Sequence, residues 1–192
     1  MVRVGEQTGE LDTSFGSGGL SNLTMNDCSK LELTDLVASG GGFIGSFHAV
    51  CGGSGGQFGG FGQYKIGLFR LGADGQLDTS WQSGGWSIMD TPAPGESGKI
   101  RATGLADVQT LSPVDGYYLS FTGGHCVSQP WNQAQCFAGV LHFARDGSVD
   151  PSYGNYQAWR VIEDSQAMMT SSSDLVADRW GRLVLTGWRK EH

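Results

Sequence analysis

The sequence predicts an all-β, propeller-like fold on the basis of its composition, its short strands and a repeated turn. Glycine supplies 32 of the 192 residues, and charged residues make up only 16%. This composition disfavours long solvated helices and coiled coils, which draw about half of their residues from Ala, Glu, Lys, Leu and Arg. Short apolar or alternating runs end at Asp-Gly and other turn-forming clusters, as strands that enter tight turns do.

The repeated turn has the pattern Gly-x-x-Asp-x-Ser-aromatic and aligns without gaps at 9–19, 75–85 and 147–157. A recurring period of this length exceeds the roughly 33 to 34 residues of ankyrin and tetratricopeptide repeats, whose paired helices it also lacks. We therefore expect a single repeat domain, 1–192, with units at about 9–74, 75–146, and 147–192 plus 1–8. The aspartate and aromatic columns hold Asp12, Asp78 and Asp150, and Phe15, Trp81 and Tyr153.

Each unit is predicted to contain four strands. Apolar or alternating runs at 65–75 and 137–147 lead into the turn, and 85–90 and 158–164 follow it. Further runs at 99–110, 116–124, 181–188 and 42–50 supply the remaining strands. Short antiparallel strands in groups of four at a fixed period are typical of propeller blades.

The segments FRLGADGQLDTSWQSGG and LVADRWGRLVLTGW resemble the bacterial delta-60 repeat family. The resemblance touches all three units and is most specific at the Asp-Gly-x-Leu-Asp-x-Ser-aromatic core. It implies a propeller-like fold and no particular activity, because the function of that family is largely uncharacterised. The first unit departs from the pattern with Thr8 in place of Asp74 and Asp146, and the third has Pro151 after its aspartate.

The two ends of the chain predict how the last blade is completed. A gapless alignment places residues 2–4 over 68–70, so the chain begins with a strand that normally finishes a unit, while 181–192 ends one strand short. We expect three four-stranded blades, the last closed by the N-terminal strand. Propellers typically need 4 to 8 blades. Either two chains form a six-bladed homodimer, or the remainder of a larger propeller completes the ring.

The four cysteines lie at 28, 51, 126 and 136 without a Cys-x-x-Cys spacing. Cys126 and Cys136 flank a hairpin loop, which favours a disulfide, with free thiols or a metal site including His125 as alternatives. Cys28 and Cys51 are the other candidate pair. Two disulfides would indicate an extracellular or periplasmic location. No cofactor is predicted.

The repeated aspartates have two interpretations. The pairs Asp74 with Asp78 and Asp146 with Asp150 could supply carboxylates to calcium. An Asx turn, in which the aspartate side chain accepts a backbone N–H two residues on, is the simpler explanation. The aromatic residue is then expected to plug the turn against the neighbouring blade. Separately, Trp131 and His125 are the candidate ligand-binding residues, and Trp180 and Trp188 are further candidates for sugar stacking.

The sequence offers no convincing pair of catalytic carboxylates, no histidine–nucleophile arrangement and no complete set of metal ligands, which favours binding over catalysis. A net charge of −7 repels nucleic acid, and no apolar run is long enough for a membrane span. We expect a non-catalytic binding or assembly module that recognises a protein or glycan through loops at 52–63, 91–98 and 127–135. The alternatives are a hydrolase or lyase with His48 or His125 in a central channel, and a structural subunit of a larger assembly.

Overall fold

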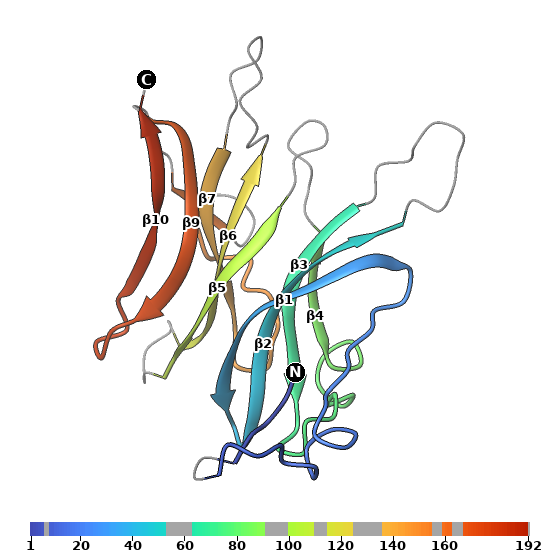
Figure 1. Cartoon of the computed structure of the whole chain (residues 1–192). Coiled ribbons are helices and arrows are strands. Elements are labelled where there is room, and N and C mark those ends of the chain that lie inside the picture. Colours follow the sequence, from blue (N-terminus) through green and yellow to red (C-terminus); the bar gives the residue numbers. More distant parts are fainter. Residues whose placement is uncertain are drawn as a thin grey trace.

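A computed structural model of the chain shows an all-β protein (Figure 1). Among the described residues there are ten strands, paired mainly antiparallel, and no helix. Accordingly, no helix in this part of the chain is long and apolar enough to cross a membrane. The described residues are 1–5, 8–52, 63–90, 100–109, 115–124, 136–154, 159–162 and 167–191.

The first sheet is a four-stranded antiparallel meander in the order β1-β2-β3-β4. The turn between its first two strands contains Gly40 and Gly41 at φ values of 58° and 78°, which glycine adopts without a Cβ penalty. Most apolar residues of β2 and β3 are buried, as expected for central strands. The strands are β1 (Cys28–Ser39), β2 (Gly42–Cys51), β3 (Gln63–Leu71) and β4 (Trp86–Asp90).

The second sheet repeats this meander and extends it. Its consecutive antiparallel strands are β5 (Arg101–Val108), β6 (Gly116–Gly124), β7 (Cys136–Phe143) and β8 (Trp159–Ile162). A hairpin of β9 (Ala167–Ala177) and β10 (Leu183–Glu191) follows. One parallel pair, Cys136 with Met169, joins β9 to β7 and makes this sheet six-stranded.

The hairpins β1–β2, β5–β6 and β9–β10 share one register. Each hairpin has a register shift at the same position, where Thr34, Thr103 and Ser173 respectively are skipped. The first two of these hydroxyls bond across the hairpin, Thr34 Oγ1 to Ser46 Oγ at 2.8 Å and Thr103 Oγ1 to Ser120 Oγ at 2.9 Å. A bulge fixes strand register, so the shared position makes β1, β5 and β9 structural counterparts.

Counterpart strands pack against one another across the sheets. Strand β5 packs across β1, β2 and β3, and β9 packs in the same way across β5, β6 and β7. Buried apolar side chains fill the space between the first two meanders, including Ile44, Leu68, Leu119 and Phe121. Two further apolar clusters lie on the other face of the first sheet and between the second meander and β9.

The N-terminal segment does not complete the last sheet within a single chain. Val2 forms a bridge with Leu20 and Val4 with Leu11, so the segment pairs with its own turn. In the described part of the chain, β10 pairs with β9 alone. Figure 1 shows the two chain ends well apart. The expected closure by the N-terminal strand is therefore wrong for the isolated chain.

The gapless alignment of the N-terminal segment is also wrong by one residue. The backbone N–H of Asp12 donates to Arg3 O, just as Asp78 donates to Arg70 O. Arg3 is therefore the counterpart of Arg70, and Val2 and Val4 are the counterparts of Phe69 and Leu71. The physical reason is a longer turn: Gly5 N bonds to Glu10 O, whereas Gly72 N bonds to Gln76 O.

Candidate functional site

The repeated turns are built around aspartate side chains that accept local hydrogen bonds. Asp78 Oδ1 accepts the backbone N–H of Ser80 at 3.1 Å and its hydroxyl at 2.5 Å. The same two bonds join Asp12 to Ser14 and Asp150 to Ser152. The serine hydroxyl is the leading cause that holds the pKa of each of these aspartates below its ordinary value. Each turn therefore has the geometry expected of an Asx turn.

A basic side chain faces the second oxygen of each turn aspartate. Arg3 Nε lies 2.8 Å from Asp12 Oδ2, and Arg70 Nε lies 3.4 Å from Asp78 Oδ2. In the third turn, His142 Nδ1 lies 2.9 Å from the Oδ2 of its aspartate. Both oxygens of each carboxylate thus have protein partners, which favours the structural interpretation of these aspartates over calcium ligation.

Sequence reasoning missed these basic partners, although a signal was present. Arg70 and His142 each stand eight positions before their aspartate, while Arg3 stands nine positions before its own. The extra residue in the first turn hid the correspondence. In the described part of the chain, no group of three or more His, Cys, Asp or Glu side chains is arranged to hold a metal ion.

The turn aromatics connect each turn to the next. A Cβ added to Gly75 would overlap the Phe15 ring, and a Cβ added to Gly147 would overlap the Trp81 ring. Both glycines have positive φ, 78° and 87°. The turns also bond directly, because Gln82 Nε2 donates to the backbone carbonyl oxygen of Asp146 at 2.7 Å. The three turns consequently form a row at one end of the sheets.

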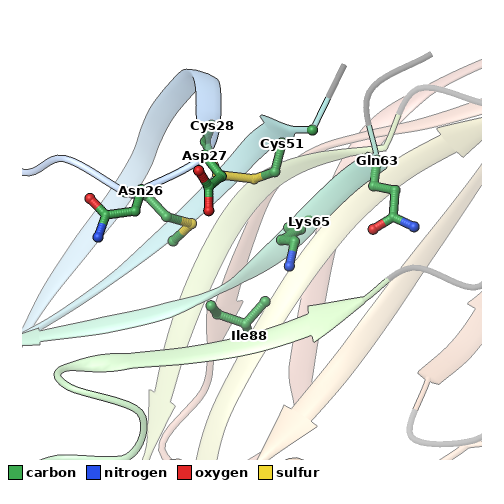
Figure 2. A pocket seen from close by; sticks show the side chains of 9 residues that line it. Asn26, Asp27, Cys28, Cys51, Gln63, Lys65 and Ile88 are labelled. Atoms are coloured by element: carbon green, nitrogen blue, oxygen red, sulfur yellow. A yellow bond between two sulfur atoms is a disulfide. The ribbon is translucent and has the colours of Figure 1, made fainter. Parts of the chain in front are cut away.

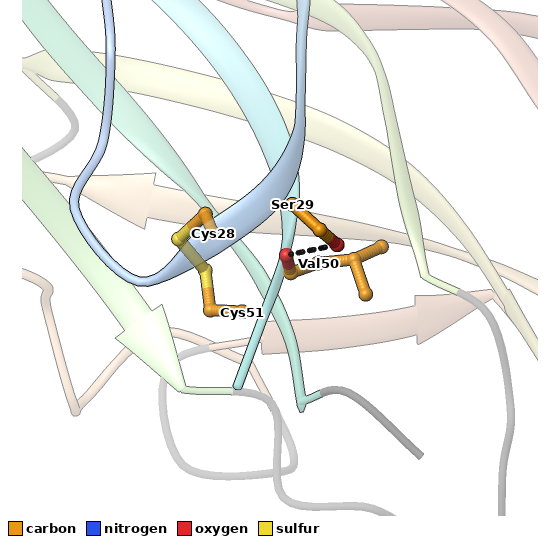
Figure 3. The surroundings of a disulfide bond; sticks show 4 residues. All are labelled: Cys28, Ser29, Val50 and Cys51. Atoms are coloured by element: carbon orange, nitrogen blue, oxygen red, sulfur yellow. Dashed lines mark hydrogen bonds between the residues drawn. A yellow bond between two sulfur atoms is a disulfide. The ribbon is translucent and has the colours of Figure 1, made fainter. Parts of the chain in front are cut away.

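The opposite end of the first sheet is closed by the disulfide Cys28–Cys51. Figure 3 shows that it joins the start of β1 to the end of β2. Beside it, the Ser29 hydroxyl donates to the Val50 carbonyl at 3.3 Å. The disulfide therefore fixes the strand end from which the chain continues into the predicted loop 52–63.

A pocket of about 360 Å³ lies next to this disulfide. Figure 2 shows Asp27 beside the disulfide and Gln63 on the far side, with Lys65 and Ile88 between them. Its polar groups include a carboxylate, an ammonium group and two amides, and its apolar wall includes a methionine and an isoleucine. The lining residues are Met25, Asn26, Asp27, Cys28, Cys51, Gly52, Gln63, Lys65 and Ile88.

His48, a candidate for the alternative catalytic site, pairs with a glutamate on the adjacent strand. Its Nε2 lies 2.6 Å from Glu32 Oε2, directly across the β1–β2 ladder. The imidazole is buried, and burial lowers its pKa despite the opposing effect of Glu32. His48 does not line the pocket described above. The pair therefore links β1 to β2, and neither His48 nor Glu32 lines the pocket.

Several predicted residues cannot be placed in this site. His125, Cys126, Trp131 and the Cys136 side chain lie outside the described residues, as do most of the three predicted recognition loops. Trp180 and Trp188 are exposed, and the guanidinium groups of Arg179 and Arg182 both lie over the Trp180 ring. Comparison with family models, curated proteins and solved structures found no match.

Proposed function

We propose that the chain is a non-catalytic, propeller-type binding module, and that the end of the sheets opposite the turns is its recognition face. The repeated hairpin register and the packing of β5 and β9 across preceding sheets support a row of blades. Blade folds support many unrelated functions, so the function must be argued from the site.

In each sheet, strand ends that border a predicted loop lie at the end opposite the turns. Cys51 pairs with Gln63 at the end of β2 and the start of β3, and Gly124 pairs with Cys136 at the equivalent ends of β6 and β7. The row of turns lies at the other end of the same strands. This division supports separate roles, with the turns holding neighbouring units together and the loop end available for a ligand.

The pocket beside the disulfide is the observation that carries the proposal. Its volume falls in the usual range for small-ligand sites, roughly 300 to 1,000 Å³. The amides of Asn26 and Gln63, with the Asp27 carboxylate and the Lys65 ammonium group, offer both donors and acceptors. Such a set suits the hydroxyls of a sugar ring. We therefore infer that the ligand is a glycan, of which one ring enters the pocket.

The Cys28–Cys51 disulfide supports a site of action outside the reducing cytosol. Because the disulfide forms part of the pocket wall, the oxidised chain is the binding-competent form in this proposal. The expected locations are the extracellular space or the periplasm.

A glycan array tests the proposal. The oxidised full chain should bind a defined set of immobilised oligosaccharides, and Gln63→Ala should weaken the best of these interactions by about tenfold, the effect of one lost hydrogen bond. Gln76→Ala is the matched control, because Gln76 is an exposed glutamine at the turn end. Absence of oligosaccharide binding, or equal affinities for Gln63→Ala and the wild type, would overturn the proposal.

A further inference from the structure

The N-terminal segment exposes apolar side chains whose counterparts are fully buried. Val2 is 60% exposed and Val4 is 55% exposed. Their counterparts in β3, Phe69 and Leu71, are both 0% exposed. In β7 the same positions hold Leu141 and Phe143, which are also 0% exposed. The positions of Val2 and Val4 therefore belong to the core in both complete meanders but are exposed in the N-terminal segment.

The last hairpin, β9–β10, also exposes an apolar side chain whose counterparts are buried. Val184 in β10 is 49% exposed, whereas its counterparts Ile44 in β2 and Tyr118 in β6 are 1% and 3% exposed. The counterpart assignment follows from the shared hairpin register, in which Val176 pairs with Val184 as Val37 pairs with Ile44. In the complete meanders the following hairpin covers this face, since Ile44 lies in one apolar cluster with Leu105 of β5 and Tyr118 lies in another with Leu175 of β9. In the described part of the chain, β9–β10 also lacks a third strand along the open edge of β10.

The uncovered edges match each other in hydrogen bonding as well as in apolarity. Strands β2 and β6 each pair with a third strand, β3 and β7, along the edge that β10 leaves open. The third strand also pairs with its own turn, since Leu71 bridges Leu77 as Val4 bridges Leu11. Residues 2–4 have this turn pairing only, so their second edge is open among the described residues.

We propose that a second copy of this chain covers both surfaces, with residues 2–4 of each copy adding to β10 of the other. The counterpart registers of β2–β3 and β6–β7 give the pairing: Val4 opposite Leu183, Arg3 opposite Val184, and Val2 opposite Leu185. The N-terminal segment of each copy contacts β10 of the other, so the two equivalent contacts close a twofold-symmetric, isologous pair. Main-chain hydrogen bonds join the copies by strand addition.

The turn contacts support the same arrangement. Phe15 covers Gly75 and Trp81 covers Gly147, so each turn aromatic covers the glycine of the following turn. Gly9 is the corresponding glycine of the first turn, and a Cβ added there would meet no atom within 4 Å. Tyr153 is the third turn aromatic. In the proposed pair, Tyr153 of one copy covers Gly9 of the other.

Strand β1 supplies a third uncovered surface. Leu36 is 39% exposed, although its counterparts Leu105 in β5 and Leu175 in β9 are 3% and 1% exposed. Strands β5 and β9 are covered by the preceding counterpart strand, β1 and β5 respectively. In the proposed pair, β9 of the other copy takes that place against β1.

The solution mass of the full chain tests this inference. Sedimentation equilibrium should give twice the 20.4 kDa mass of one chain. Val4→Asp would bury a charge at the contact and should raise the dissociation constant on the order of 100-fold. Val184→Lys would place a cation opposite Arg3 and should act in the same direction. Thr79→Asp, at an exposed position of the second turn, is the control that should leave the mass unchanged.

Mixing the Val4→Asp and Val184→Lys variants distinguishes this contact from other modes of association. The Val4→Asp chain keeps an intact β10, and the Val184→Lys chain keeps an intact N-terminal segment. A mixture should therefore form a mixed pair through one restored contact, while each chain alone stays monomeric. A single-chain mass for the wild type, or a dimer that survives both substitutions, would overturn the inference. Glycan binding is measured independently, because the pocket lies at the opposite end of the sheet.

Discussion

Trp81 lies directly over Gly147, so that any Cβ on this glycine would overlap the indole ring. The two residues belong to successive turns, and Phe15 and Gly75 repeat the relationship one unit earlier. The aromatic side chains of the first and second turns thus each contact the glycine of the following turn. This contact explains why the motif needs an aromatic residue and a glycine at fixed positions.

Gly147→Ala is expected to destabilise the fold by roughly 2 to 5 kcal/mol. The positive φ of 87° costs an alanine about 1 to 2 kcal/mol, and overlap with Trp81 adds an overpacking cost of about 1 to 3 kcal/mol. Gly84→Ala is the control, since its φ is 67° but no atom lies within 4 Å of the added Cβ. Urea unfolding compares them, and equal losses would show that the aromatic contact is unimportant.

Trp81→Ala is expected to lower the free energy of unfolding by about 3 to 5 kcal/mol, as for a large aromatic side chain in a core. Trp81 is 6% exposed and packs within the cluster between the sheets. Trp180→Ala should cost about 1 kcal/mol or less, because that indole is 62% exposed and its arginine contacts are at the surface. Thermal or urea denaturation measures both. Similar losses for the two variants would contradict the assignment of Trp81 to the core.

Replacing both Cys28 and Cys51 by serine should destabilise the fold by about 3 kcal/mol, because the disulfide closes a loop between residues 23 positions apart. The same variant should bind glycan more weakly, since both cysteines line the pocket. Unfolding curves and array binding test the two effects separately. Unchanged stability would contradict a structural role for this disulfide.

Stability should fall as the pH drops below about 6.5, because burial lowers the pKa of His48 from its ordinary value of 6.5. The unfolded chain then binds a proton that folded His48 takes up only at lower pH. The stabilising contribution of neutral His48 is therefore complete above pH 6.5 and decreases as the pH falls toward the folded pKa. Glu32 opposes this shift, while Arg101 and Lys30 reinforce it.

His48→Gln provides the comparison, since glutamine keeps a side-chain donor for Glu32 but does not titrate. Its stability should change less than that of the wild type between pH 7 and pH 5. Chemical denaturation at a series of pH values measures this difference. Parallel curves for the two proteins would rule out His48 as the source of the pH dependence.

Local sequence patterns predicted the turns and most of the strands, but β1 and β9 were not among the predicted runs. Alternating apolar residues marked β3 and β7, and the aspartate two residues before a serine marked each Asx turn. Such features depend on residues close together in the chain. The pairing of Arg70 with Asp78 was missed because the alternating pattern does not specify which polar side chains meet across the turn.

The sequence by itself determined that this protein is all-β, with three equivalent turns and a candidate Cys28–Cys51 pair. Propensity, turn chemistry and repetition act locally, and the chain carries them explicitly. Only the tertiary structure decided where Val2, Val4 and Val184 lie and that they are exposed. Burial depends on which distant strand covers a side chain, and the local sequence pattern does not specify that strand.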